Sequence, residues 1–417
     1  MPVITATVRL FVALATGAAV LVLPQPRVTC DAAYAQASTG PLHLERMQAP
    51  DLTDGLTVTI SDGRRASVLL DRDYSTSYAF TGSISIELSS EEEIHAVYII
   101  WALPPGEWEL TGRQKIVCGK NGFIHEFVPL PDPTRELVMQ IPPGGATLCD
   151  IYAFSEGEPP DWVQIWRPPL LAADILAMPT HADDEHLSFA GILPYYAGEL
   201  GLLVQVAYMT NHWNSPPRPH EMLDGLWVVG IRNYPIIGGF RDRYADSLEQ
   251  ARSLYTWSEV VDYQVELIRR FKPRVVVGHD LRGEYGHGVH MLNAHALVEA
   301  VSFAADATYH EASLEMYGVW DTPKLYLHLY RENAITMDWS KPLERFGGRT
   351  AYDMAVAGYD CHRSQHHWSF AVPSSGSRGH LFGLVRSLVG PDRAGGDLFE
   401  NIERSRFSIN DGVMSIN

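Results

Sequence analysis

The sequence predicts an α/β chain in two parts, a smaller all-β sandwich followed by a larger domain built on a mostly parallel sheet. Short alternating strands and frequent turns fill residues 45–157, and strand-like and helix-like segments alternate after residue 171. Proline pairs separate the two textures. The length of 417 residues leaves room for two or three domains of about 150 residues.

Composition excludes several classes of protein. Hydrophobic residues make up 46% of the chain and charged residues 20%, which are ordinary globular values and exclude a wholly disordered or fibrous protein. The chain has 32 Lys and Arg against 50 Asp and Glu, so its formal net charge is -18. Because such a chain repels phosphate backbones, we expect no nucleic-acid partner.

Residues 1–37 are typical of a secretory signal peptide. Arg9 precedes an almost entirely apolar run at 10–23, and Ala35-Gln36-Ala37 places small residues before a cleavage point at Ser38. The alternative is a membrane anchor, but the run is shorter than the ~20 residues that a span needs. We therefore expect a secreted, cell-surface or periplasmic protein with no stable membrane span once the signal is removed.

The all-β sandwich is expected over residues 38–158. Its expected strands cover 84–88, parts of 94–101, 107–112, 124–130, 136–141 and 147–154, and its turns fall at 104–106, 120–122, 131–133 and 142–145. Cys118 and Cys149 lie in this part of the chain. Their spacing leaves a disulfide bridge and two unrelated buried thiols equally open.

A proline-rich connector at 159–170 leads into the second domain, expected over 171–417. The expected strands are 173–178, 202–209, 274–278 and 325–329, and the expected helices are 186–200, 218–231, 257–271 and 291–303. This alternation predicts βαβ units in a Rossmann-like, mostly parallel sheet. Because sites in such sheets form at the carboxyl ends of strands, the residues after each strand are the first candidates for chemistry.

The first candidate motif occupies residues 180–186, where the strand at 173–178 ends. His181 and Asp184 are three residues apart, so a single turn can place both side chains on one face. An imidazole and a carboxylate are good partial ligands for zinc. Asp183 then lies beside the metal without being needed as a ligand, where a general base for a water molecule belongs.

The second candidate motif, at 279–290, also follows an expected strand. His287 and His290 share a helix face, and one of them can complete a site of two histidines and one carboxylate with an open fourth position. The other histidine is then left near the substrate, and Tyr285 can supply an O–H donor.

Each motif alone has an ordinary explanation. A single HxxD is more often helix-capping chemistry, and a single HxxH is more often two satisfied histidines. Two such motifs at strand ends of one α/β region indicate a metal site. Zinc is the expected ion, and ferrous iron also accepts this ligand set.

These motifs resemble those of the PIG-L/LmbE-like family of zinc-dependent N-acetylglucosaminide deacetylases. The family's H-P-D-D-E stands here as residues 181–185, and its Y-G-H-P-D-H stands as residues 285–290. The resemblance spans about 172–300 and extends more loosely to 361–365 and 382–402.

The resemblance implies roles for individual residues. It implies zinc on His181, Asp184 and His290, and Asp183 as the general base. It also implies that His287 and Tyr285 act on the tetrahedral intermediate.

Two further segments are similar to family features that face the substrate. Arg218 and Glu221 match an R-x-x-E helix start, and Asp242 matches a later acidic loop, so Arg218 and Asp242 are expected to bind substrate. The chain departs from the family where Ala182 replaces proline and where residues 288–289 replace Pro-Asp. The second departure removes a carboxylate and bears on the surroundings of His287 more than on the metal.

The N-terminal part resembles the discoidin or coagulation-factor type C, galactose-binding-like family. The resemblance rests on residues 70–78 and on the last strand, at 150–157. It implies sugar binding, and the alternative is a structural sandwich that shields the second domain.

Together these observations predict an exported zinc-dependent hydrolase that removes acetyl from an N-acetylated amino sugar or glycan. One alternative is the same metal chemistry on another amide conjugate. A second is a cell-surface glycan-binding protein whose second domain is inert. The intact His181, Asp183, Asp184 and His290 argue against inertness.

Overall fold

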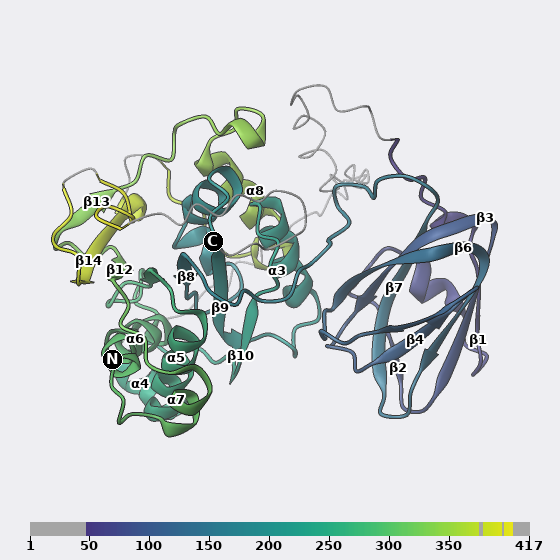
Figure 1. Ribbon diagram of the computed structural model, residues 1–417, viewed down its shortest axis with the longest axis horizontal. Helices are drawn as coiled ribbons and strands as arrows, with labels where there is room; N and C mark the ends of the chain where they lie inside the picture. Colours follow the sequence, from purple (N-terminus) through teal and green to yellow (C-terminus); the bar gives the residue numbers. More distant parts are fainter. Residues whose placement is uncertain (1–46, 375–377, 394–395, 403–417) are drawn as a thin grey trace, which may run out of the picture.

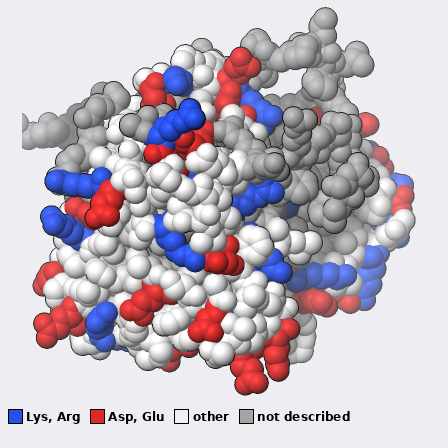
Figure 2. Space-filling model, turned by 60° about the vertical axis from the view of Figure 1, so that its left-hand side comes forward, with Lys and Arg blue, Asp and Glu red and all other residues white. Residues whose placement is uncertain are grey.

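The computed structural model describes residues 47–374, 378–393 and 396–402 (Figure 1). The predicted signal peptide lies outside these described residues. Two β-sheet regions lie side by side, one almost without helices and one covered by them. None of the helices within the described residues has the length and apolar character needed to cross a membrane. On the face shown in Figure 2, acidic and basic side chains of the described residues are interspersed.

The first region is an antiparallel sheet of seven strands among the described residues, in the order β2-β7-β3-β6-β4-β5 with β1 paired to β3. Its strands are β1 (Thr57–Ile60), β2 (Tyr78–Phe80), β3 (Ile84–Trp101), β4 (Trp108–Thr111), β5 (Lys115–Cys118), β6 (His125–Ile141) and β7 (Ala146–Phe154). The strands curve around a core that contains Trp101 and Trp108. The strand pairings connect all seven strands into one continuous sheet. The predicted sandwich of two packed sheets therefore stays a prediction.

The predicted turn at 131–133 was wrong, because β6 runs through it. Pro129 pairs with Ala96 and Thr134 pairs with Ile94, so the residues between Pro129 and Thr134 bulge against the single residue His95. Proline lacks the N–H that a sheet ladder needs and is therefore tolerated in a bulge. The bulge lets one long strand replace the two that the sequence predicted.

The two cysteines of this region are separate thiols. Cys118 lies on the edge strand β5, and Cys149 lies on β7 toward the other side of the sheet. Burial raises the pKa of both thiols to about 12. The spacing left a disulfide bridge and two separate buried thiols open, and the structure has the two separate thiols.

The second region is a sheet of seven strands among the described residues, in the order β10-β9-β8-β11-β12-β14-β13. Its strands are β8 (Ile175–Ala177), β9 (Val204–Asn211), β10 (Ile236–Arg241), β11 (Val275–Gly278), β12 (Lys324–His328), β13 (Ala334–Thr336) and β14 (Leu381–Ser387). The pairings from β10 to β12 are parallel, and those of β14 are antiparallel. The prediction of an α/β domain with a mostly parallel sheet is confirmed.

Helices cover both faces of this sheet. One face packs against α4 (Leu248–Leu254), α5 (Trp257–Phe271), α6 (Gly288–Ala304) and α7 (Glu311–Tyr317), which form one group in Figure 1, and the other lies toward α3 (Pro217–Val228) and α8 (Ala351–Asp360). A hydrophobic core lies on each face of the sheet, and successive strand residues point to opposite faces. Ile175 and Ala177 pack in one core, and Leu176 and Met178 pack in the other. The central strand β8 lies between β9 and β11, so the loops after β8 and β11 meet at the strand ends.

The predicted helix at 186–200 is broken in the structure. Helix α2 covers only Asp184–Leu187, and a π-helical segment follows at Leu193–Glu199. Between them Ala190 has a left-handed backbone (φ 43°). A Cβ on Gly191 would clash with the Trp339 ring, lying 2.6 Å from Cε3, so this close approach requires glycine and interrupts the helix.

The antiparallel region packs on the domain that follows it. Phe123 stacks on Tyr234 with ring centroids 4.4 Å apart, and His125 Nε2 lies 2.8 Å from Nδ1 of His220 on α3. Tyr74 stacks on the same His220, with ring centroids 4.6 Å apart. The contacts with His220 tie the first region to α3, and the contact with Tyr234 ties it to the segment that follows this helix.

Candidate metal centre

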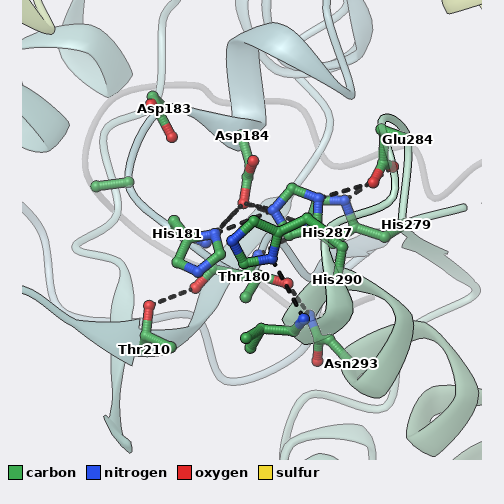
Figure 3. Close-up of polar contacts among 12 residues, drawn as sticks. Thr180, His181, Asp183, Asp184, Thr210, His279, Glu284, His287, His290 and Asn293 are labelled. Carbon is green, nitrogen blue, oxygen red and sulfur yellow. Dashed lines mark hydrogen bonds and ion pairs between the residues drawn. The ribbon is translucent and has the colours of Figure 1, made fainter. Parts of the chain in front are cut away.

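The two predicted motifs meet because their strands are neighbours. Residues 180–186 follow β8, residues 279–290 follow β11, and β8 pairs with β11 in parallel. Thr180 N donates to His279 Nε2 (2.9 Å), and Asn293 Nδ2 of α6 donates to Thr180 Oγ1 (3.0 Å; Figure 3). These bonds lock the two loops together at the carboxyl edge of the sheet.

Three side chains converge on one point. His181 Nδ1 lies 3.1 Å from Asp184 Oδ2 and 3.0 Å from His290 Nε2, and His290 Nε2 lies 3.2 Å from Asp184 Oδ2. All three residues are buried. Atoms this far apart leave room for a point about 2.0–2.2 Å from each, which is the distance of zinc from nitrogen and oxygen ligands. The donor set therefore fits a divalent zinc-type ion.

The orientation of His290 supports this fit. Its Nδ1 lies 2.8 Å from Glu284 Oε2, so a neutral ring donates from Nδ1 and directs the lone pair of Nε2 into the centre. Metal-binding histidines almost always have such an outer carboxylate or carbonyl partner, which fixes the tautomer.

Glu284 serves several histidines at once. Its Oε1 accepts from Asp280 N (2.9 Å) and lies 2.9 Å from His279 Nδ1 and 3.1 Å from His328 Nδ1. Burial alone would raise the pKa of Glu284, but the neighbouring His279 and the hydrogen bonds from the histidines hold it well below the usual range. Glu284 is therefore the carboxylate that orients this half of the centre.

His279 belongs to the support rather than to the ligands. It lies near Asp184 and His290, and its ring stacks on the His290 ring with centroids 4.2 Å apart. However, the lone pair of its Nε2 accepts the Thr180 N–H, and its Nδ1 faces Glu284. With both nitrogens engaged, His279 positions its neighbours.

The opposite side of the centre is held by Asp242 and His212. Asp242 Oδ1 lies 3.4 Å from His181 Nε2, and Asp242 Oδ2 lies 3.3 Å from His212 Nδ1. His212 Nε2 accepts the Ala182 N–H (3.1 Å). A proline at position 182 would lack this donor, so the departure from the family motif adds a hydrogen bond that anchors His212.

Asp183 lies beside the three converging atoms without joining them, as Figure 3 shows. It is buried, has a left-handed backbone (φ 117°), and its Oδ1 lies 3.6 Å from Arg218 NH2. Burial and the charge of Asp184 raise the pKa of Asp183 to about 8, and Arg218 opposes the rise. Such a backbone is strained in a residue other than glycine and is often retained at functional sites.

His287 and Tyr285 border the centre on the side of the second motif. The His287 ring lies 4.9 Å from the His181 ring and 4.6 Å from the His290 ring. Its Nδ1 accepts the Val289 N–H (3.2 Å) and caps α6, so the neutral ring carries its proton on Nε2. Burial and the two neighbouring histidines lower the pKa of His287 to about 3. Tyr285 is 57% exposed, with its ring 5.7 Å from the His287 ring.

The structure thus brings every predicted site residue to one place. His181, Asp184 and His290 form the converging set, and the others surround it: Asp183, Arg218, Asp242, Tyr285 and His287. Their chemical roles stay predictions. The supporting residues Glu284 and His279 were not singled out from the sequence, although both lie inside the second motif.

No protein-family model matches the chain. A curated relative, 1D-myo-inositol 2-acetamido-2-deoxy-alpha-D-glucopyranoside deacetylase 2 of Saccharopolyspora erythraea, is 29% identical over 171 residues, which are 35% of this chain and 61% of the relative. The chain spans about half the length of the curated relatives it matches.

Two solved structures illustrate the structural likeness. N,N'-diacetylchitobiose deacetylase from Pyrococcus horikoshii is 18% identical with a TM-score of 0.36, and the match covers 46% of this chain and 71% of that one. A chitosan-binding module from a Paenibacillus sp. IK-5 chitosanase/glucanase is 14% identical with a TM-score of 0.22, and the match covers 25% of this chain and 99% of the module. The chain is thus similar in sequence, over about a third of its length, to curated deacetylases.

Proposed function

We propose that this chain is a metal-dependent N-deacetylase that releases acetate from an N-acetylated amino sugar. The observation that carries the proposal is the convergence of His181 Nδ1, Asp184 Oδ2 and His290 Nε2 within 3.0–3.2 Å of one another. The curated relatives are named as deacetylases of a 2-acetamido sugar, which supports the same reaction class here.

The three converging side chains would hold a divalent ion, with zinc as the first candidate and ferrous iron as the second. Such an ion, when bound, polarises an amide carbonyl and lowers the pKa of a water molecule toward ~7. Glu284 keeps the imidazole of His290 in the orientation that this binding needs, and Asp242 Oδ1 lies 3.4 Å from the outer nitrogen of His181.

Asp183 is the group placed to take a proton from the attacking water. Its carboxylate is buried beside the centre and is not needed to complete the ligand set. Arg218 NH2 lies 3.6 Å from Asp183 Oδ1 and donates to Ala182 O (2.6 Å), so the guanidinium holds the loop and offers a cation to the substrate. After the transfer, the protonated Asp183 can return the proton to the leaving amine.

His287 and Tyr285 are placed to stabilise the oxygen that gains charge as the amide is attacked. The Nε2–H of neutral His287 is not occupied by a hydrogen bond among the described residues, because only its Nδ1 caps the helix. Tyr285 is exposed, and its ring lies 5.7 Å from the His287 ring. Donors aimed at such an oxygen are typically worth ~3 kcal/mol each when enclosed.

The proposal is tested by measuring acetate release and bound metal together. A panel of N-acetylated amino sugars, with other N-acyl conjugates as a second set, is incubated with the full chain before and after chelation. We expect acetate from the sugars, loss on chelation and recovery with zinc. If the carboxylic acid were released only from the other N-acyl conjugates, the substrate would be another amide and not an amino sugar. A metal-loaded chain that released acid from neither set would overturn the hydrolase proposal.

We also propose export and removal of residues 1–37. The support is the apolar run at 10–23 followed by Ala35-Gln36-Ala37. The mature protein should begin near Ser38 outside the cytoplasm, and an N-terminal sequence that retained residues 1–20 would contradict this.

A further inference from the structure

A second histidine–carboxylate cluster lies at helix α2, separate from the ligand set described above. Glu185 and His186 belong to α2, and His362 follows the end of α8. Each of the three side chains is fully buried, with 0% exposure. The ligand atoms of the three residues lie within 4.8 Å of one another.

The polar atoms of this cluster have no ordinary partners. Glu185 Oε1 lies 3.4 Å from His186 Nε2 and 3.2 Å from His362 Nε2, yet neither contact has hydrogen-bond geometry. Among the described residues, Glu185 Oε1 and both ring nitrogens of each histidine lack a hydrogen-bond partner. Buried polar atoms are almost always satisfied, so a group of five without partners requires an explanation.

A cation between the three side chains would bond to three of these five atoms, Glu185 Oε1 and one nitrogen of each histidine, and would account for their spacing. In a tetrahedral zinc site with bonds of about 2.0–2.2 Å, the ligand atoms lie roughly 3.3–3.6 Å apart. The two carboxylate–imidazole distances are close to this spacing. Each lone pair would then point at the ion rather than at the oxygen, which explains why the contacts miss hydrogen-bond geometry.

The surrounding helices are shaped to hold the rings where they are. A Cβ on Gly225 of α3 would lie 2.6 Å from His186 Nε2 and 3.1 Å from His362 Nε2. A Cβ on Gly358 of α8 would lie 2.6 Å from His186 Nδ1. Both positions therefore need glycine, and packing fixes the imidazoles before any ligand arrives.

The remaining ligand positions are also accounted for. Glu185 Oε2 accepts the Asp183 N–H (2.9 Å), which leaves Oε1 for the cluster. The Tyr208 hydroxyl on β9 interacts with Glu185 and is likewise buried without a hydrogen-bond partner among the described residues. It offers an oxygen, or a partner for a water molecule, at a fourth position.

We infer that Glu185, His186 and His362 form a second, structural site for a divalent transition-metal ion of the zinc class. Because Glu185 also holds the Asp183 backbone, this ion would fix α2 and the strained Asp183 beside the first centre. The site goes beyond the proposed function, since its ligands are not used in deacetylation.

Metal counting tests the inference. The full chain, loaded with zinc and dialysed, should contain two zinc ions, and titration of the metal-free protein should show two binding steps. His362→Ala and His290→Ala should each retain one ion, and the double variant none. The matched control is His366→Ala, because the His366 ring contacts the Tyr359 carbonyl and does not belong to the cluster. This variant should retain two zinc ions.

The outcomes separate this inference from the proposed function. A single zinc in the unaltered protein, unchanged in His362→Ala, would overturn the second site even where acetate release is normal. Two zinc ions without acetate release would leave the second site standing and overturn the deacetylase proposal. If His362→Ala does not fold, the titration of the unaltered protein still decides between one site and two.

Discussion

The two histidine–carboxylate clusters at α2 contain the same donor types but are held in different ways. In the first cluster each outer nitrogen has a carboxylate beside it: His290 Nδ1 donates to Glu284 Oε2 at 2.8 Å, and His181 Nε2 lies 3.4 Å from Asp242 Oδ1 without a hydrogen bond. In the second cluster the outer nitrogens of His186 and His362 have no hydrogen-bond partner among the described residues. There, close packing against glycines sets the ring positions instead.

The two arrangements suit different tasks. Outer carboxylates tune the basicity of a ligand and fix its tautomer, as a reactive centre needs. The first cluster also borders exposed Tyr285, whereas the second is sealed. Packing without hydrogen bonds suits a site that only has to stay in place.

The largest expected effect comes from removing a ligand of the first cluster. His290→Ala leaves one imidazole and one carboxylate, which hold zinc poorly, so bound zinc at this centre and acetate release should fall together to background. Zinc content and acetate are measured on the same preparations. His295→Ala, a half-buried histidine on the same helix, is the control and should keep both.

A smaller but still large effect is expected from Asp183→Asn. Asparagine tolerates the left-handed backbone, so the fold and the zinc should stay, while loss of the base lowers the rate by ~10²–10⁴-fold. The check is kcat alongside zinc content. Were zinc lost here but kept in His290→Ala, base and ligand would have been assigned the wrong way round.

Glu284→Gln probes the outer carboxylate directly. Glutamine keeps the size of the side chain but removes the charge that faces His279, His290 and His328. We expect a loss of ~10–100-fold in zinc affinity or activity, the usual cost of removing such a partner. An unchanged zinc affinity and rate would mean that packing alone orients His290, as in the second cluster. Glu311→Gln on the exposed start of α7 serves as the control.

The smallest effect is expected from Tyr285→Phe. An enclosed donor to the developing oxyanion is worth ~10²–10³-fold, and an exposed one such as Tyr285 should contribute about tenfold in kcat. Tyr244→Phe is a matched comparison, because Tyr244 is also exposed and its ring lies 5.1 Å from His287. A larger loss in Tyr244→Phe than in Tyr285→Phe would assign the donor role to Tyr244.

Much of the fold followed from local patterns. The helix expected at 257–271 has those bounds in the structure, because its apolar spacing is strongly periodic. The failures have tertiary causes. The helix expected at 186–200 is interrupted where Trp339, more than a hundred residues away, packs on Gly191, and the turn expected at 131–133 became a bulge because β3 offers a partner on both sides of it.

Local spacing along the chain specifies which donor types lie together, because His181 with Asp184 and His287 with His290 are each separated by one turn of chain. Which of these atoms meet depends on the tertiary fold. The pairing of β8 with β11 brings His290 to His181, and the buried Glu284 selects the nitrogen that His290 presents. Distances between elements depend on strand order and packing, and one sequence without its fold does not contain them in any local pattern.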